Sequence, residues 1–426
     1  MSIKSREGGA TGDPARLKRR LAYAERTNRL RAFGLVLPLL LFLLFTFLVP
    51  IGSMLWRAVE DWEVADAFPA TVQELTRWDG HDLPDEATFA ALKQDLVDAR
   101  ESGKLGNAAK RLNNVSSGFR SVLSSTGRQL TKLSGLAKLS ESESAKSALI
   151  DINDAWGETT TWDAIRAASG PVTSFYLLKS LDFQAAPDGS IVSVPENEAI
   201  YRNVFFRTFA ISAAVTALCL GLGFPVAYLL ASLPPRHSNL LMIFVLLPFW
   251  TSLLVRTCAW IVLLQTEGPI NELLQWTGVI QEPMRLVYNR FGVLVAMTHV
   301  LLPFMILPLY SSMKSISPVY VRAAHSLGAS PTRAFYRIYL PQAIPGIGAG
   351  SLLVFILAIG YYITPALVGG AEDQMISYFI AFFTTETVNW GLASALGAML
   401  LVATFLLAGV YSRLVYGVQV TGGTKN

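Results

Sequence analysis

Long apolar segments constrain the fold of this chain more than any other feature of its sequence. An α-helix rises about 1.5 Å per residue, so about 20 apolar residues are needed to cross the roughly 30 Å of hydrocarbon in a bilayer. Runs of this length predict six membrane spans, at residues 33–56, 205–231, 240–264, 291–311, 345–367 and 391–416. The sequence therefore predicts an all-α membrane protein with six transmembrane helices.

The composition agrees with a chain that is surrounded by lipid. Apolar residues make up 52% of the 426 residues and charged residues only 15%, which lies on the membrane side of the usual soluble composition. The net charge is +4, and basic residues gather beside apolar segments, where they fix the orientation of a membrane protein. We therefore expect contacts with membrane lipid and no nucleic-acid partner.

The two cysteines do not indicate a disulfide framework or a metal site. Cys219 and Cys258 both fall inside apolar segments, and neither belongs to a CxxC or Cys/His pattern. Such cysteines behave as small apolar side chains, so we expect both to be buried. No metal-binding residues are predicted.

Charge and alternation of the spans predict the domain order. A Lys- and Arg-rich stretch precedes the first span, and basic residues near a span favour the cytoplasmic side. Six crossings then return the C-terminus to the same side and place the long segment after the first span outside. The predicted domains are a basic cytoplasmic tail 1–32, a first helix 33–56, an extracytoplasmic insert 57–203, a five-helix core 204–416 and a cytoplasmic tail 417–426.

The insert is long enough to be a soluble domain of its own. Between residues 87 and 139, apolar side chains such as Phe89, Leu92 and Leu96 recur at helical spacing among charged residues, which predicts two or three amphipathic helices. Aromatic residues near its two ends, including Trp62 and Trp156, fit either a small core or the membrane interface.

A polar segment between the fourth and fifth predicted spans, residues 320–341, predicts two short helices that face the cytoplasm. Val321, Ala324 and Leu327 form the small apolar face of the first helix, and Gly328 supplies a permissive turn. Ser330 followed by Pro331 is typical of a helix start.

The dipeptide Leu340-Pro341 is expected to end the second of these helices. The spacing fits an amphipathic helix on the membrane surface about as well as a docking element for a partner. A resemblance favours the second interpretation.

The segment resembles the "EAA" signature of permease subunits in bacterial binding-protein-dependent ABC importers. The matching residues are Ala323-Ala324, then Gly328 four residues later, then Ile338-x-Leu340-Pro341. One residue differs, because Arg322 occupies the position of the signature's Glu, so a Glu-based contact does not transfer. The resemblance covers about residues 205–416 and implies the type I ABC importer permease fold.

Further runs are similar to the spermidine/putrescine group of these permeases. They include Leu247 to Trp260, Gly268 to Asn271 and Tyr361 to Pro365. The resemblance implies transport of a small polar solute such as a polyamine, in the bacterial inner membrane. The insert at 57–203 is much longer than the corresponding loop of typical members, so its role does not transfer.

The resemblance also implies partners and a coupling role for residues 320–341. The implied partners are two ATP-binding subunits, a second homologous permease or a second copy of this chain, and a periplasmic or lipid-anchored solute-binding protein. This chain has no P-loop, so we expect no catalytic residues and no bound cofactor, with ATP and Mg²⁺ on the partner ATPase. The residues expected to couple transport to that ATPase are Arg322, Ala323, Ala324, Leu327, Gly328, Ala329, Phe335, Ile338, Leu340 and Pro341.

Candidate residues of the translocation pathway lie in or beside the spans. An ionised group at membrane depth is costly, so Arg256 is expected to line the pathway, to pair with an acid or to pack against carbonyls. If the transported solute is a polyamine, the positive charge of Arg256 would repel it, which favours a gate or a structural role for Arg256. For His299 a buried neutral imidazole is favoured over a proton relay. The candidate set is Trp250, Arg256, Trp260, His299, Tyr361 and Tyr362, whose aromatic rings can hold a cation or only pack.

Two other classes of function compete with a permease. A membrane-anchored sensor would bind a ligand in the insert and relay a signal through the spans, although no output domain follows the sixth span. A membrane enzyme would need a catalytic constellation, and the sequence shows no paired carboxylates, Ser/His/Asp set or metal-ligand spacing. We expect the permease.

Overall fold

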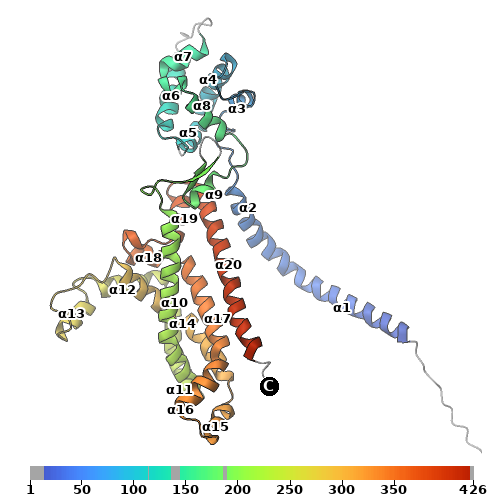
Figure 1. Cartoon of the computed structure of the whole chain (residues 1–426), viewed down its shortest axis with the longest axis vertical. Coiled ribbons are helices and arrows are strands. Elements are labelled where there is room, and N and C mark those ends of the chain that lie inside the picture. Colours follow the sequence, from blue (N-terminus) through green and yellow to red (C-terminus); the bar gives the residue numbers. More distant parts are fainter. Residues whose placement is uncertain (1–13, 114, 136–143, 186–189, 423–426) are drawn as a thin grey trace, which may run out of the picture. The chain divides into compact units, whose positions relative to one another are not determined.

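A computed structural model describes residues 14–113, 115–135, 144–185 and 190–422 (Figure 1). The predicted tails 1–32 and 417–426 therefore lie partly outside the described residues. The chain divides into two compact units, residues 1–56 and 57–426. Each unit is described by itself.

The described residues of the first unit form one helical run. It consists of α1 (Pro14–Leu43), a π-helical turn (Leu44–Leu48) and α2 (Val49–Arg57), which follow one another without a break. Its apolar part, Arg31–Arg57, is long and apolar enough to cross a membrane. It contains the predicted first span.

The second unit holds the remaining long apolar helices. They are α10 (Tyr201–Ser232), α14 (Arg290–Ser315), α17 (Leu340–Gly360) and α20 (Trp390–Gly422). With Arg31–Arg57, the described residues contain five helices that satisfy the length and hydropathy of a span, or six when one bent pair is counted as a span. The all-α membrane fold predicted from the sequence is confirmed.

Helices α10, α14 and α17 pack around a shared apolar core that includes Cys219, Met305 and Val354. Small residues allow this approach: a methyl group on Gly346 of α17 would lie 2.4 Å from Ser312 Cβ of α14. The expected burial holds for Cys219, whereas Cys258 is exposed, so that prediction was wrong for the second cysteine.

The predicted third span, 240–264, is broken rather than continuous. It divides into α11 (Pro235–Leu246), a 3₁₀ turn (Leu247–Trp250) and α12 (Leu253–Leu264), followed by α13 (Pro269–Trp276), with a bend of 96° at the break. Pro248 cannot donate a backbone hydrogen bond, and Ser252 caps the new helix because its Oγ accepts from the Val255 N–H at 3.2 Å.

The predicted fifth span, 345–367, also differs from the structure. Helix α17 ends at Gly360 because Tyr361 is extended, and the chain continues through α18 (Ile363–Val368), a 3₁₀ turn (Ala371–Asp373) and α19 (Ile376–Thr385). Helix α19 is apolar but has only 10 residues, about half the length of a membrane span.

The insert is a helical bundle with one small sheet. Its helices are α3 (Pro69–Leu75), α4 (Glu86–Glu101), α5 (Leu105–Asn113), α6 (Phe119–Gly135), α7 (Ala145–Ile152), a 3₁₀ turn (Asp154–Gly157), α8 (Thr159–Ala167) and α9 (Phe175–Ser180). Strands β1 (Phe183–Ala185) and β2 (Ile191–Ser193) pair antiparallel.

Tryptophans form the centre of the insert's own core. Trp156 and Trp162 are fully buried, and the Trp162 ring meets Phe89 edge to face with centroids 4.6 Å apart. Each indole N–H is satisfied, Trp156 by Thr126 Oγ1 and Trp162 by the Trp156 carbonyl, both at 3.0 Å. These two residues therefore fill a core, while Trp62 remains about half exposed.

Candidate functional site

The segment that carries the signature begins with a capped helix, α15 (Pro318–Ser326). The Ser317 Oγ accepts a hydrogen bond from the Val319 N–H at 3.4 Å. Pro318 occupies the first helical position, where a backbone N–H would have no partner within the helix. Helix α15 therefore starts two residues earlier than Tyr320, where the first predicted helix begins.

Gly328 ends α15 in a left-handed turn with φ of +86°. The Gly328 N–H bonds the His325 carbonyl at 2.9 Å, and the Ala329 N–H bonds the Ala324 carbonyl at 3.0 Å. This pair of bonds is the Schellman motif, in which glycine avoids the steric cost of a Cβ. The predicted turn at Gly328 is thus present.

The second short helix does not end at Leu340-Pro341. Helix α16 (Pro331–Ala334) runs through a π-helical turn (Phe335–Tyr339) directly into α17. Pro341 falls in the first turn of α17, directly after the π turn, so the helix continues through a residue that has no N–H to donate. The expected helix end was wrong, and α16 continues into a spanning helix without a break.

One face of the segment is open and the other is packed. The predicted residues Arg322, Ala323, Leu327 and Gly328 are exposed, and the Leu327 side chain is 89% accessible. Ala324 and Ala334 are buried against the protein. The remaining predicted positions, Ala329, Phe335, Ile338 and Leu340, are half-buried, whereas Pro341 is exposed.

An aromatic cluster connects the segment to α10. The Phe335 ring lies 6.2 Å from Phe224 and 5.8 Å from Tyr228 between centroids, and Tyr228 meets Tyr339 at 5.2 Å. Sequence reasoning identified Phe335 but missed the other three. The signal was available, since Phe224 with Tyr228 and Phe335 with Tyr339 are each four residues apart and share a helix face.

The structure brings four of the six candidate pathway residues together where α12, α14 and the end of α17 meet. The Trp260 Nε1–H donates to His299 Nδ1 at 3.2 Å, and the two rings meet with centroids 5.5 Å apart. Arg256 lies near both His299 and Tyr361. The Nε and Nη1 atoms of Arg256 are buried and make no hydrogen bond to the residues that the structure describes. Two strong donors of Arg256 thus have no hydrogen-bond partner among the described residues.

The other two candidates lie apart from this cluster. Trp250 ends the 3₁₀ turn at the break of the third span and is 88% exposed, and Tyr362 is also exposed. Within the described ranges, neither ring makes an aromatic contact or a side-chain hydrogen bond with Arg256, Trp260 or His299. These two residues have no contact that assigns them a role.

Comparison with known proteins agrees with this architecture. Residues 223–419 match the family described as the binding-protein-dependent transport system inner membrane component. Over 216 residues the chain is 36% identical to the spermidine/putrescine transport system permease protein PotB of Escherichia coli (strain K12), covering 51% of this chain and 78% of that protein. The chain belongs to this family of ABC importer permeases.

Two further likenesses extend the comparison. The permease is 30% identical over 258 residues to the inner membrane ABC transporter permease protein YdcU of Escherichia coli (strain K12), which covers 57% of this chain and 78% of that protein. The structure of a bacterial ABC transporter involved in the import of the acidic polysaccharide alginate aligns with a TM-score of 0.42 and 18% identity, covering 53% of this chain and 80% of that chain.

Family membership establishes the class of activity. The permease is a multi-pass inner-membrane component of an ABC importer and not an enzyme, because a separate ATPase subunit hydrolyses ATP in this family. A solute-binding protein is part of the same kind of system, as the family description states. The insert at 57–203 lies outside the residues that match the family.

Proposed function

We propose that this permease forms the inward path for a small organic cation of the polyamine class. The observation that carries the proposal is the 36% identity to a protein named as a spermidine/putrescine permease. The cluster of Arg256, Trp260, His299 and Tyr361 contributes to this path. Because the charge of Arg256 opposes a passing amine, Arg256 acts as a gate rather than as a binding group.

Residues 320–341 couple the path to the ATPase. Support comes from the open face around Leu327 and from the unbroken helical connection of α16 to α17. The full assembly contains two ATP-binding subunits, which hold ATP and Mg²⁺, a second permease or a second copy of this chain, and a periplasmic or lipid-anchored binding protein. Both termini and the segment lie in the cytoplasm, and the insert lies outside.

Transport of the proposed solute is testable in proteoliposomes that contain the permease with its ATPase and binding protein. We expect ATP-dependent accumulation of labelled putrescine, inhibited by excess spermidine and not by excess glutamate or molybdate. Accumulation that spermidine fails to inhibit, or an absence of uptake by an active ATPase complex, would contradict a polyamine substrate.

Coupling is tested best at Leu327, because an exposed side chain can be changed without disturbing the fold. We expect Leu327→Asp to keep membrane insertion but to lower uptake at least tenfold, since an aspartate would be desolvated in the docking groove. Val172→Asp, an exposed apolar position of the insert, is the matched control. Equal uptake by the two variants would contradict a role for Leu327 in docking to the ATPase.

A further inference from the structure

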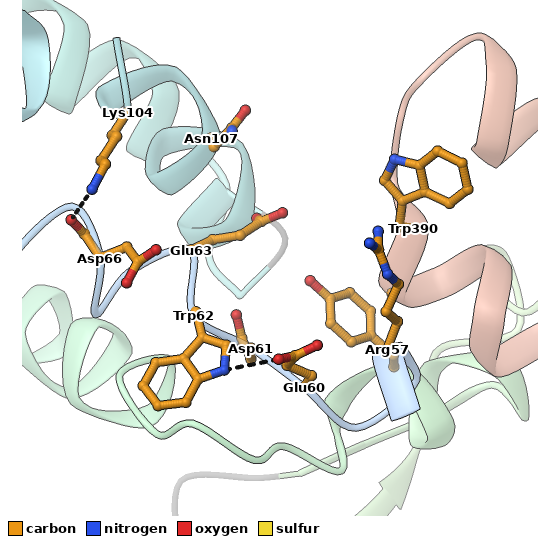
Figure 2. A pocket seen from close by; sticks show the side chains of 11 residues that line it. Arg57, Glu60, Asp61, Trp62, Glu63, Asp66, Lys104, Asn107 and Trp390 are labelled. Atoms are coloured by element: carbon orange, nitrogen blue, oxygen red, sulfur yellow. Dashed lines mark hydrogen bonds between the residues drawn. The ribbon is translucent and has the colours of Figure 1, made fainter. Parts of the chain in front are cut away.

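A cavity of about 450 Å³ lies between the insert and the start of α20. Carboxylates dominate its wall: Glu60, Asp61, Glu63 and Asp66 all come from the loop between α2 and α3. Aromatic rings complete the wall, with Trp62 on that loop and Trp390 at the start of α20 (Figure 2). The acidic loop lies in the insert, outside the residues that match the family, whereas Trp390 lies within them.

Asp61 brings a buried and incompletely bonded carboxylate to this wall. Its side chain is only 1% exposed, and its Oδ2 accepts from Arg111 Nε at 2.7 Å. The other oxygen, Oδ1, makes no hydrogen bond of normal geometry to the described residues. A buried acceptor without a donor costs free energy, so Asp61 places an incompletely satisfied acceptor behind the cavity wall.

Two cations, Arg57 and Lys104, also line the cavity, but among the described residues neither forms an ion pair with its carboxylates. Lys104 Nζ donates to the backbone carbonyl of Asp66 at 3.4 Å, and the Arg57 guanidinium lies 5.4 Å from the centre of the Trp390 ring. Within the described part of the chain, Glu60, Glu63 and Asp66 form no ion pair. Figure 2 shows the side chains of Glu60 and Glu63 beside the same open space.

The chemistry of this wall selects the ligand. Ammonium groups form charge-assisted hydrogen bonds with carboxylates and pack on open aromatic faces, and the Trp62 ring is 48% exposed. The carboxylates are spread along the wall: in the described residues, no three acidic, His or Cys side chains converge closely enough to hold a metal ion. An elongated ligand with separated charges matches this spread better than a compact ion does.

We propose that the cavity binds a small organic cation with two or more ammonium groups. The site contains no residue of the coupling segment or of the Arg256 cluster. The proposal therefore goes beyond the transport function and stands whether or not the same amine is the transported solute.

The test is calorimetric titration of the full-length permease in nanodiscs, without ATP. The probes are 1,4-diaminobutane, butylamine and MgCl₂. We expect the diamine to bind at least tenfold more tightly than the monoamine, and Glu63→Gln and Asp66→Asn each to weaken it at least tenfold. Glu101→Gln, an exposed acid of α4, is the matched control and should leave the affinity unchanged.

Other outcomes overturn the site. Diamine affinity that is the same in the cavity variants and the control, or no binding at all, would exclude it. Mg²⁺ binding with the same sensitivity to both variants would make it a metal site instead. Trp62→Phe keeps a ring but loses the hydrogen bond from Nε1 to Glu60, so a modest loss of affinity, smaller than for Glu63→Gln, is expected.

Uptake by the same variants separates this site from the transport proposal. A permease that binds the diamine in the cavity but does not transport it would contradict the proposed substrate and leave the cavity site standing. A permease that transports the diamine, but whose binding is unchanged by Glu63→Gln and Asp66→Asn, would overturn the cavity site alone.

Discussion

Gly328 shapes the end of α15 through its backbone conformation rather than through packing. A Cβ at this position would meet no atom within 4 Å, but its φ of +86° is unfavourable for any L-residue. Gly328→Ala should therefore cost about 1–2 kcal/mol locally and loosen the end of α15 without blocking membrane insertion. We expect lower uptake per ATP hydrolysed in reconstituted complexes.

A matched control for this glycine lies in α10. Gly221 has open space around it and ordinary helical geometry, so Gly221→Ala should leave coupling unchanged. Equal coupling ratios in the two alanine variants would show that the left-handed turn has no part in docking.

Glu63 carries a charge that opposes folding. The Glu63 side chain is exposed at the cavity, but partial desolvation by the surrounding protein raises its pKa, and the Asp61 charge raises it further, against Arg111 and Lys110. Because the pKa of Glu63 is higher in the folded state than in the unfolded state, its favourable contribution to stability is complete below the unfolded-state pKa. That contribution is lost as the pH rises through the folded-state pKa. Glu63→Gln should therefore raise the thermal midpoint near neutral pH.

The pH dependence gives this prediction its control. The gain in midpoint from Glu63→Gln should shrink as the pH falls to about 4, where the carboxyl is protonated in both states. Differential scanning calorimetry of the nanodisc-embedded permease measures both. A gain that persists unchanged in acid would assign the effect to packing rather than to charge.

At the scale of helices, the contact of α14 with α17 depends on one missing methyl group. A Cβ on Gly346 would lie 2.4 Å from Ser312 Cβ and 3.1 Å from the Pro308 carbonyl. Gly346→Ala should therefore destabilise the permease by about 1–3 kcal/mol, the usual cost of overpacking. Gly360→Ala on the same helix meets no atom within 4 Å and should be neutral in thermal unfolding; equal midpoints would contradict the packing role.

Helices that cross without interruption were the elements best predicted from sequence. Hydropathy located α10, α14 and α20 because a run of apolar residues is itself the physical requirement for crossing a bilayer. Hydropathy does not show where a helix axis bends. One continuous span was therefore predicted where α11 and α12 are separated at Pro248 and Ser252. The predicted fifth span also runs beyond Gly360, because the residues of α18 are apolar although they belong to a separate helix.

Residues 320–341 were predictable where their structure is local. The turn at Gly328 and the helix start at Ser330 and Pro331 depend on residue types within a few positions. The continuation through the π turn into α17 was not predictable, because Pro341 usually ends a helix. The contact of Phe335 with Tyr228 required α10 to be placed in space.

At the scale of the whole molecule, the cavity was not predictable from the sequence because its walls come from distant parts of the chain. Glu63 and Asp66 lie in a polar loop, where solvated charge is the ordinary interpretation. They face a cavity only because the start of α20, more than 300 residues later, forms the opposite wall. That contact depends on Gly391, since a methyl group there would lie 2.4 Å from the Tyr176 ring.

The proposed orientation of the molecule is tested by labelling from one side of the membrane. In a background carrying Cys219→Ala and Cys258→Ser, Glu101→Cys places a single thiol on the insert, and Leu327→Cys places one on the coupling segment; both positions are exposed. Because an outward insert and a cytoplasmic segment face opposite compartments, a membrane-impermeant maleimide should label Glu101→Cys in cells whose inner membrane is intact, and Leu327→Cys only after the membrane is opened. Labelling of Leu327→Cys in intact cells would reverse the topology and rule out ATPase docking at this segment.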